Sequence, residues 1–250
     1  MKKIIAIGGG EMGRPGYPIE TTAIDKEIIK LTGKKKPKLL FIPTASSDSL
    51  DYCQTVKKHF GKRLGCQVDI LYLIKNKLSN KIIKNKILKT DIIYVGGGDT
   101  LKMMRIWKQQ GVDKLLKTAY QKGVVMSGLS AGSICWFKYG NSDSKKFLNP
   151  KAGLIKVTGL GLIKALNCPH YDIEKDRKPD LKKMMKKTSG VAIALDNCSA
   201  LEVIDNNYRV ISSKTSANAY IIYWKANKYI EKVIKKEKVF KPLTKLLLKL

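Results

Sequence analysis

Residues 125–137 read VMSGLSAGSICWF, and the order of residue types in this stretch decides the fold class. The apolar run that starts at Gly123 predicts a buried strand, whereas the residues after Ser130 predict a helix. The sequence GLSAG (128–132) lies between them, and G-x-S-x-G at a strand-to-helix turn is typical of a nucleophile elbow. Its glycines prevent clashes where strand and helix cross closely. We therefore expect an α/β fold with a reactive serine after a central strand.

The geometry of such an elbow has a direct chemical use. It directs the Oγ of Ser130 away from the sheet and places the N–H of Ala131 at the N-terminus of the next helix, where it can stabilise an oxyanion. The alternative is that Ser130 is only a small residue at a crowded turn. Because the expected strand and helix flank the motif, we favour the nucleophile.

Short β-branched runs alternate with longer amphipathic runs on both sides of this motif. The alternation predicts a three-layer sandwich, a mostly parallel central sheet with helices on both faces. The expected strands cover 3–7, 38–43, 67–73, 91–95, 123–129, 161–166, 191–195, 201–204, 208–212 and 220–224. The later strands are close enough in sequence to pair antiparallel. The chain has no internal repeat and no low-complexity linker, so residues 1–250 are expected to form one domain.

Capping residues and apolar spacing predict the helices. The first expected helix begins at Thr21 or Thr22 and ends near Leu31, and the second runs from Leu50 to Phe60. Two short helices are expected within 100–122, and another covers 180–187. Residues from about 226 to 250 are expected to form a basic helical extension. Its apolar spacing fits a helix packed on the body or on a second subunit, which leaves a homodimer open.

Composition indicates in which cell compartment the protein works and which classes of partner it binds. The formal charge of +29 comes from 49 Lys and Arg against 20 Asp and Glu. The lysines are spread over the whole chain, and the two clustered stretches, 33–38 and 232–250, do not have the aromatic interleaving that stacks bases. This pattern indicates a solvated surface rather than a nucleic-acid site. No stretch approaches the ~20 apolar residues of a membrane helix, so no membrane span is expected. Five widely spaced cysteines indicate buried thiols in a reducing cytoplasm.

Two further glycine motifs follow strands. The sequence GGGEMG (8–13) matches a dinucleotide fingerprint, but RPGYP (14–18) places prolines where the helix should begin, so we do not expect a nucleotide there. The sequence YVGGGDT (94–100) could donate backbone N–H groups to an oxyanion. Its other interpretation is a tight turn capped by Asp99 or Thr100.

A serine nucleophile needs a base, and the chain has only two histidines. His59 lies late in a lysine-rich helix and is expected to be a solvated residue at the helix end. His170 follows an apolar strand and a proline, in the kind of loop at the end of a sheet that could face the elbow. We therefore expect His170 to be the base.

Six motifs occur in a specific order along the chain. They are AIGGGE (6–11), FIPTAS (41–46), IYVGGGDT (93–100), GLSAGS (128–133), CPHYD (168–172) and ALDNCSALEV (194–203). Together they resemble the serine peptidases of the dipeptidase E and cyanophycinase family, whose fold is similar to that of class I glutamine amidotransferases. The resemblance implies Ser130 as nucleophile, His170 as general base, and the N–H groups of Gly98 and Ala131 as the oxyanion hole.

The resemblance to this family is less close at the other candidate site residues. The resemblance implies that Asp143 lies at the site and that Arg177 binds an acidic substrate side chain; an exposed loop charge is the alternative for Arg177. Where the family has a glutamate to orient the histidine, this chain has Asn197. An asparagine can accept the Nδ1–H bond but brings no charge to stabilise an imidazolium. Asp143, Asp196 and Glu202 remain alternatives for that position.

The sequence thus predicts a cytoplasmic serine peptidase that cleaves small peptides, with N-terminal aspartyl peptides as the first candidates, through an acyl-enzyme. Neither a metal nor an organic cofactor is expected. A cyanophycinase-like or other amide hydrolase on the same fold is the alternative enzyme. The alternative of another class is a basic nucleic-acid-binding protein without catalysis, in which Ser130 is structural.

Overall fold

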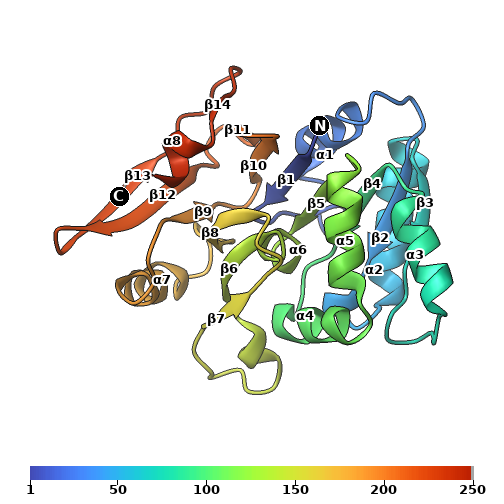
Figure 1. The fold of residues 1–250 in the computed structure, drawn as a ribbon, viewed down its shortest axis with the longest axis horizontal. Helices are drawn as coiled ribbons and strands as arrows, with labels where there is room; N and C mark the ends of the chain where they lie inside the picture. Colours follow the sequence, from blue (N-terminus) through green and yellow to red (C-terminus); the bar gives the residue numbers. More distant parts are fainter. Residues whose placement is uncertain (249–250) are drawn as a thin grey trace.

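A computed structural model describes residues 1–248 and contains two β-sheets (Figure 1). The larger sheet has the strand order β14-β11-β10-β1-β5-β4-β2-β3. Its strands are β1 (Lys3–Ile7), β2 (Lys38–Ile42), β3 (Gln67–Ile70), β4 (Ile92–Val95), β5 (Val125–Leu129), β10 (Ser199–Ile204), β11 (Asn207–Ser212) and β14 (Lys241–Pro242). The five strands β1, β5, β4, β2 and β3 are parallel to one another. On the other side of β1, the pairs β1–β10, β10–β11 and β11–β14 are antiparallel.

Helices cover both faces of the larger sheet. The helices of the described chain are α1 (Thr22–Lys30), α2 (Leu50–Val56), α3 (Asn80–Leu88), α4 (Thr100–Gln109), α5 (Val112–Gln121), α6 (Ala131–Ile134), α7 (Arg177–Lys186) and α8 (Thr244–Leu247). Three short helices, η1 (Thr44–Ser46), η2 (Lys57–Arg63) and η3 (Ser144–Phe147), complete the set in residues 1–248. The predicted α/β class with a mostly parallel central part is therefore confirmed.

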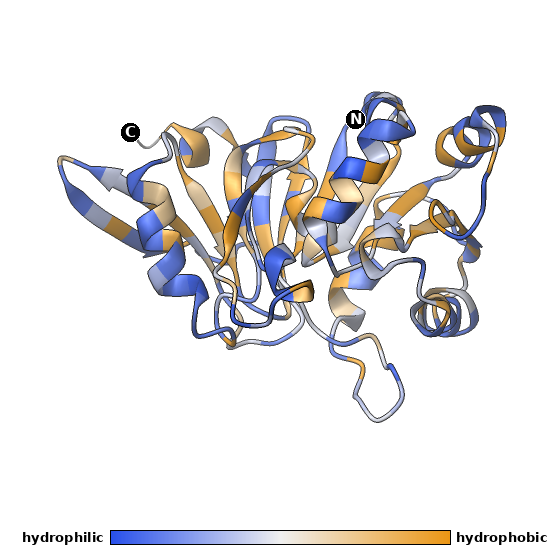
Figure 2. Ribbon diagram, turned by 90° about the horizontal axis from the view of Figure 1, so that it is seen from below, coloured by the Kyte–Doolittle hydropathy of each residue, from blue (hydrophilic) through white to orange (hydrophobic). Residues whose placement is uncertain are grey.

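Alternating residues of β1 explain why the sheet is covered on both sides. Ile4 and Ala6 belong to a core shared with α3, α4 and α5, whereas Ile5 and Ile7 belong to a second core shared with α1, α2 and η2. Successive side chains of a strand point to opposite faces, so an all-apolar strand requires cover on both. The apolar residues follow the strands and the inner sides of the helices (Figure 2).

A second sheet, which the sequence did not predict as separate, has the order β13-β12-β9-β8-β6-β7. Its strands are β6 (Phe137–Ser142), β7 (Ile155–Thr158), β8 (Ile163–Cys168), β9 (Ala192–Leu195), β12 (Ala219–Lys225) and β13 (Lys228–Val233). One face packs on the core of the larger sheet, and α7 covers the other through Leu181 and Met185. The strand β8 leads directly toward the predicted base.

The expected helical extension from about 226 is wrong for the residues that the structure describes. Residues 219–233 form an antiparallel hairpin of β12 and β13, and only Thr244–Leu247 is helical. Ala226 and Asn227 have φ values of 47° and 60°, which is the backbone of a two-residue hairpin turn. The rings of Trp224 and Tyr229, which are paired across the two strands, then meet edge to face with their centroids 5.7 Å apart.

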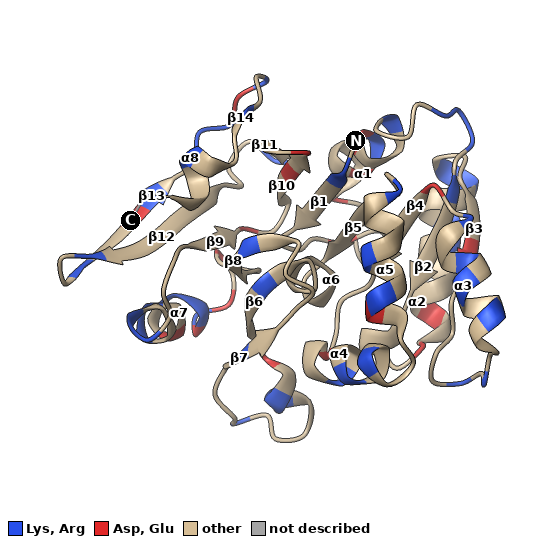
Figure 3. Cartoon of the chain, viewed as in Figure 1, with Lys and Arg blue, Asp and Glu red and all other residues tan. Residues whose placement is uncertain are grey.

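The burial of the cysteines fits the expectation from composition. Lys and Arg lie on elements at both ends of the molecule (Figure 3). All five cysteines are free and buried. Within residues 1–248, no helix has the length and apolar content needed to cross a membrane.

Candidate active site

Ser130 lies at a sharp turn between β5 and α6. Its φ of 55° and ψ of −114° are unusual for a residue with a side chain, and its N–H donates to the Ile7 carbonyl at 3.1 Å. The two flanking glycines permit this turn because a Cβ on Gly128 would lie 2.5 Å from the Val95 carbonyl oxygen and one on Gly132 only 2.0 Å from it. The elbow expected from the sequence is therefore present.

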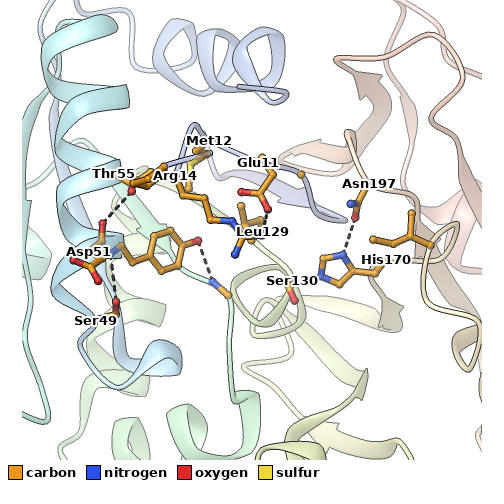
Figure 4. Close-up of a pocket in the computed structure, with 15 residues that line it drawn as sticks. Glu11, Met12, Arg14, Ser49, Asp51, Thr55, Leu129, Ser130, His170 and Asn197 are labelled. Atoms are coloured by element: carbon orange, nitrogen blue, oxygen red, sulfur yellow. Dashed lines mark hydrogen bonds and ion pairs between the residues drawn. The ribbon is translucent and has the colours of Figure 1, made fainter. Parts of the chain in front are cut away.

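His170 follows β8 and faces the same cavity as Ser130. Its backbone N–H donates to the Gly8 carbonyl at 3.1 Å, which joins the loop after β8 to the loop after β1. Its Nδ1 lies 2.7 Å from the Oδ1 of Asn197. An amide oxygen can only accept, so in the neutral imidazole this contact places the hydrogen on Nδ1 and leaves the lone pair on Nε2. Figure 4 shows the imidazole beside the Ser130 side chain.

The glycine motif at 8–13 has a packing role here. A Cβ on Gly9 would lie 2.4 Å from both Cε1 and Nδ1 of His170 and 2.1 Å from Oδ1 of Asn197. Only a residue without a side chain fits against this pair. The glycine therefore makes room for the imidazole and the amide that orients it.

Gly9→Ala is expected to lower kcat about 100-fold, because the added methyl group must displace His170 by a substantial fraction of an ångström. Gly153→Ala is the matched control, since a Cβ there meets no atom within 4 Å and the residue is not in the left-handed region. Steady-state kinetics with thermal unfolding of both variants checks this. Equal turnover by the two variants would contradict the packing role.

The glycine turn after β4 lies beside the elbow. The Gly97 N–H donates to the Tyr52 hydroxyl at 3.3 Å. Within residues 1–248, the N–H groups of Gly98 and Ala131 have no such hydrogen-bond partner. Gly98 and Ala131 do not line the pocket themselves, but each is next in sequence to a residue that does, Gly97 and Ser130 respectively.

The three acidic alternatives for orienting His170 lie elsewhere. Glu202 is buried on β10 and pairs with Arg209 at 2.6 Å. The Oδ2 of Asp196 accepts from the Asn218 N–H at 2.8 Å. Asp143 lies 3.9 Å from Arg177. Burial raises the pKa of the Glu202 and Asp196 carboxyls, so the surroundings of both disfavour the ionised form.

Arg177, expected to bind substrate, is placed in the interior. Only 1% of its side chain is exposed, and its guanidinium donates to Glu174 at 2.7 Å and to the carbonyl of Asn141 at 2.7 Å. Neither Arg177 nor Asp143 lines the pocket. The sequence could not reveal this because the partners of Arg177 include a backbone carbonyl 36 positions earlier in the chain.

The expectation of a solvated His59 is wrong. The residue is 2% exposed, and its Nε2 lies 2.7 Å from Oδ2 of Asp25, which also accepts from the Thr21 hydroxyl at 2.6 Å. The π-helical segment η2 turns the ring inward toward α1. Burial raises the pKa of Asp25.

The pocket has a volume of about 570 Å³ and also contains residues that the sequence analysis did not single out. They are Glu11, Arg14, Ser49, Asp51, Tyr52 and Thr55 among the polar ones, with Met12, Pro15, Leu129 and Ile173 as apolar walls. In the sequence, Glu11 and Arg14 could have been recognised as site candidates because they are two charged residues in a glycine-rich loop. No cluster of three or more potential metal ligands occurs in residues 1–248.

A model of peptidase family S51 matches residues 4–211 of the chain. The chain belongs to peptidase family S51. It is 37% identical over 225 residues to the uncharacterized peptidase YgaJ of Bacillus subtilis (strain 168), covering 88% of this chain and 91% of that protein. The resemblance to the dipeptidase E family and the expectation of a peptidase are thereby confirmed.

Two solved structures have the fold of this S51 peptidase. A peptidase from an acI-B1 Actinobacterium superposes with a TM-score of 0.72 at 19% identity, over 96% of both chains. A Listeria monocytogenes EGD-e protein provisionally described as a peptidase E gives a TM-score of 0.62 at 23% identity, over 85% of this chain and 98% of that one. At these identities the comparison supports the architecture alone.

Proposed function

We propose that this S51 peptidase hydrolyses small peptides through an acyl-enzyme on Ser130. The observation that carries the proposal is the 2.7 Å contact of His170 Nδ1 with Asn197 Oδ1, on an imidazole that lies beside the elbow serine. This contact leaves Nε2 as the basic nitrogen of the ring. A serine hydroxyl becomes an effective nucleophile only with such a base.

The reaction follows from these positions. Nε2 of His170 takes the Ser130 proton as Oγ attacks the peptide carbonyl, and the N–H groups of Gly98 and Ala131 stabilise the oxyanion. The protonated imidazole then donates to the leaving amine, and the C–N bond breaks to leave an ester on Ser130. A water molecule, deprotonated by the same Nε2, hydrolyses that ester and returns the serine.

Asn197 has a positioning role in this scheme. It accepts from Nδ1–H and fixes the tautomer and the orientation of the ring, but it adds no negative charge near the imidazolium. Its own N–H donates to Oδ1 of Asp172 at 2.9 Å, which fixes the backbone at Asn197. The amide thus resembles the asparagine of Cys-His-Asn proteases in function.

The dimensions and charges of the pocket favour a short substrate. A volume of about 570 Å³ suits a molecule of dipeptide size. The cationic Arg14 in its lining supports an acidic residue in the substrate, which makes N-terminal aspartyl dipeptides the first substrates to try. The chain's net charge of +29 also favours the approach of anionic substrates.

Covalent labelling tests the proposed nucleophile. A fluorophosphonate is expected to add one adduct, located at Ser130 by peptide mapping of the intact-mass product. His170→Ala should slow this labelling by at least about 100-fold, since general-base assistance contributes that much. Labelling at another serine, or an equal rate in the His170 variant, would refute the mechanism.

A further inference from the structure

The glycine turn after β4 is held by hydrogen bonds on both sides of one free N–H group. Its four successive N–H groups belong to residues 96–99. The first donates to the Ile42 carbonyl at 3.3 Å, the second to the Tyr52 hydroxyl at 3.3 Å, and the fourth to the Ala45 carbonyl at 2.9 Å. The third, that of Gly98, has no partner in the described part of the chain, so it is the N–H of this turn that can bind another molecule.

The same turn lies between the Tyr52 ring and the elbow serine. A Cβ on Gly96 would lie 2.9 Å from Cε1 of Tyr52, and a Cβ on Gly97 would lie 3.4 Å from Cβ of Ser130. The turn therefore contacts the tyrosine ring at one residue and the elbow at the next. Because the free N–H belongs to the peptide unit that follows, any movement of the turn changes the position of this N–H relative to Ser130.

Packing fixes the position of the Tyr52 hydroxyl before a substrate binds. Tyr52 lies in the first turn of α2, where its N–H donates to the capping Ser49 side chain at 3.3 Å. Its ring meets Phe41 of β2 edge to face, with the centroids 5.0 Å apart. Burial raises the pKa of this hydroxyl, so it stays neutral. It therefore accepts the Gly97 N–H without placing a negative charge near an oxyanion.

We propose that Tyr52 is a positioning residue of the oxyanion hole, which acts through the Gly97 N–H to hold the Gly98 N–H in place for the reacting carbonyl oxygen. A donor stabilises the transition state fully only if it is already oriented when the charge develops. Without the hydroxyl, the Gly97 N–H loses its partner and the Gly97–Gly98 peptide is free to rotate. The inference rests on the proposed function, because it assumes that an oxyanion forms next to Ser130.

Tyr52→Phe removes the hydroxyl and keeps the ring. Quenched-flow labelling over a range of fluorophosphonate concentrations gives the rate constant at saturation and the half-saturating concentration. The rate constant for Ser130 should fall about 10- to 100-fold, because the phosphoryl oxygen of the probe meets the oxyanion donors in the transition state. The half-saturating concentration should stay within about threefold of wild type, since the hydroxyl acts on the transition state. A loss confined to the half-saturating concentration would mean that Tyr52 only shapes the pocket, and it would overturn the inference.

Tyr94→Phe is the matched control. The Tyr94 ring also packs near Phe41, at 6.3 Å between centroids, and its buried hydroxyl has no hydrogen-bond partner among residues 1–248. Removing that hydroxyl breaks no hydrogen bond, so labelling should proceed within about twofold of wild type. Both variants should unfold within about 3 °C of wild type. Equal losses of labelling rate in the two variants would show that the bond from Gly97 to Tyr52 has no special part, and would contradict the proposal.

Hydrogen exchange of residues 96–99 separates this inference from the proposed function, because exchange needs no reaction. In Tyr52→Phe it should be about fivefold faster than in wild type and in Tyr94→Phe, which corresponds to the loss of one neutral hydrogen bond. Equal exchange in the three proteins would refute the hold of Tyr52 on the turn, whether or not Ser130 is labelled.

The labelling results then assign any failure. A wild type that is not labelled at Ser130 would refute the proposed function, while faster exchange in Tyr52→Phe would still support the hold on the turn. A labelled wild type with an unchanged rate constant in Tyr52→Phe would refute this inference alone. Slower labelling of Tyr52→Phe without faster exchange would also refute it, because the hydroxyl would then act on the oxyanion directly and not through the turn.

Discussion

Ser130→Ala is expected to reduce turnover of an aspartyl p-nitroanilide by about 10⁴-fold or more, which is the typical cost of removing the nucleophile of a serine peptidase. The hydroxyl does not cap α6, and alanine retains the same Cβ at the same unusual backbone angles. We therefore expect the thermal unfolding midpoint to change by less than about 3 °C, which corresponds to about 1 kcal/mol in a chain of this size.

Ser133 provides the matched control for this change. It lies on α6, the short helix that follows Ser130, is buried, and its Oγ donates to the Asn167 side chain at 3.0 Å. Ser133→Ala should cost about 1–3 kcal/mol of stability and leave kcat within about threefold of wild type. The two variants should thus separate activity from stability. Wild-type turnover by Ser130→Ala, or equal losses of turnover in both variants, would exclude Ser130 as nucleophile.

Local patterns predicted the parts of the fold that depend on neighbouring residues. The elbow could be found because its glycines, serine and flanking runs are contiguous. The same is true of β1, β2, β4 and β5, whose apolar runs match the observed strands within about two residues. The position of His170 after an apolar strand and a proline was also visible locally.

Features that depend on distant residues could not be predicted in this way. The division of the later strands into a second sheet depends on pairings such as β8 with β9 and β6 with β8. The interior position of Arg177 depends on Asn141, and the burial of His59 depends on Asp25, 34 residues away. A hairpin turn at Ala226 and Asn227 needs two left-handed residues, and alanine gives no signal for that conformation.

The second prediction with a large effect concerns this buried His59. His59→Ala should lower the free energy of unfolding by about 3–5 kcal/mol near neutral pH, because the variant leaves the Asp25 carboxyl buried with only Thr21 as a partner. Turnover measured well below the unfolding transition should stay close to wild type, since His59 does not line the pocket. His170→Ala should show the reverse, with little loss of stability and a loss of turnover of about 10⁴-fold.

The pH dependence of this loss has a definite sign. Burial raises the pKa of Asp25, whereas the contact with His59 acts to lower it, so removing the imidazole raises the pKa of Asp25 further. A carboxyl with a raised pKa in the folded state stabilises the fold below the unfolded-state pKa of about 3.9, and that contribution is lost as the pH rises toward the folded-state pKa. Urea unfolding should therefore show a larger difference between wild type and His59→Ala at pH 8 than at pH 5.

A double variant identifies the buried carboxyl as the cause. In Asp25→Asn/His59→Ala the side-chain carbonyl can still accept from the Thr21 hydroxyl, and no group at position 25 can ionise. This variant should be more stable than His59→Ala at pH 8 and should lose the extra pH dependence. If His59→Ala and the double variant were destabilised equally at pH 5 and pH 8, the loss would arise from the cavity left by the imidazole and the charge of Asp25 would have no part in it.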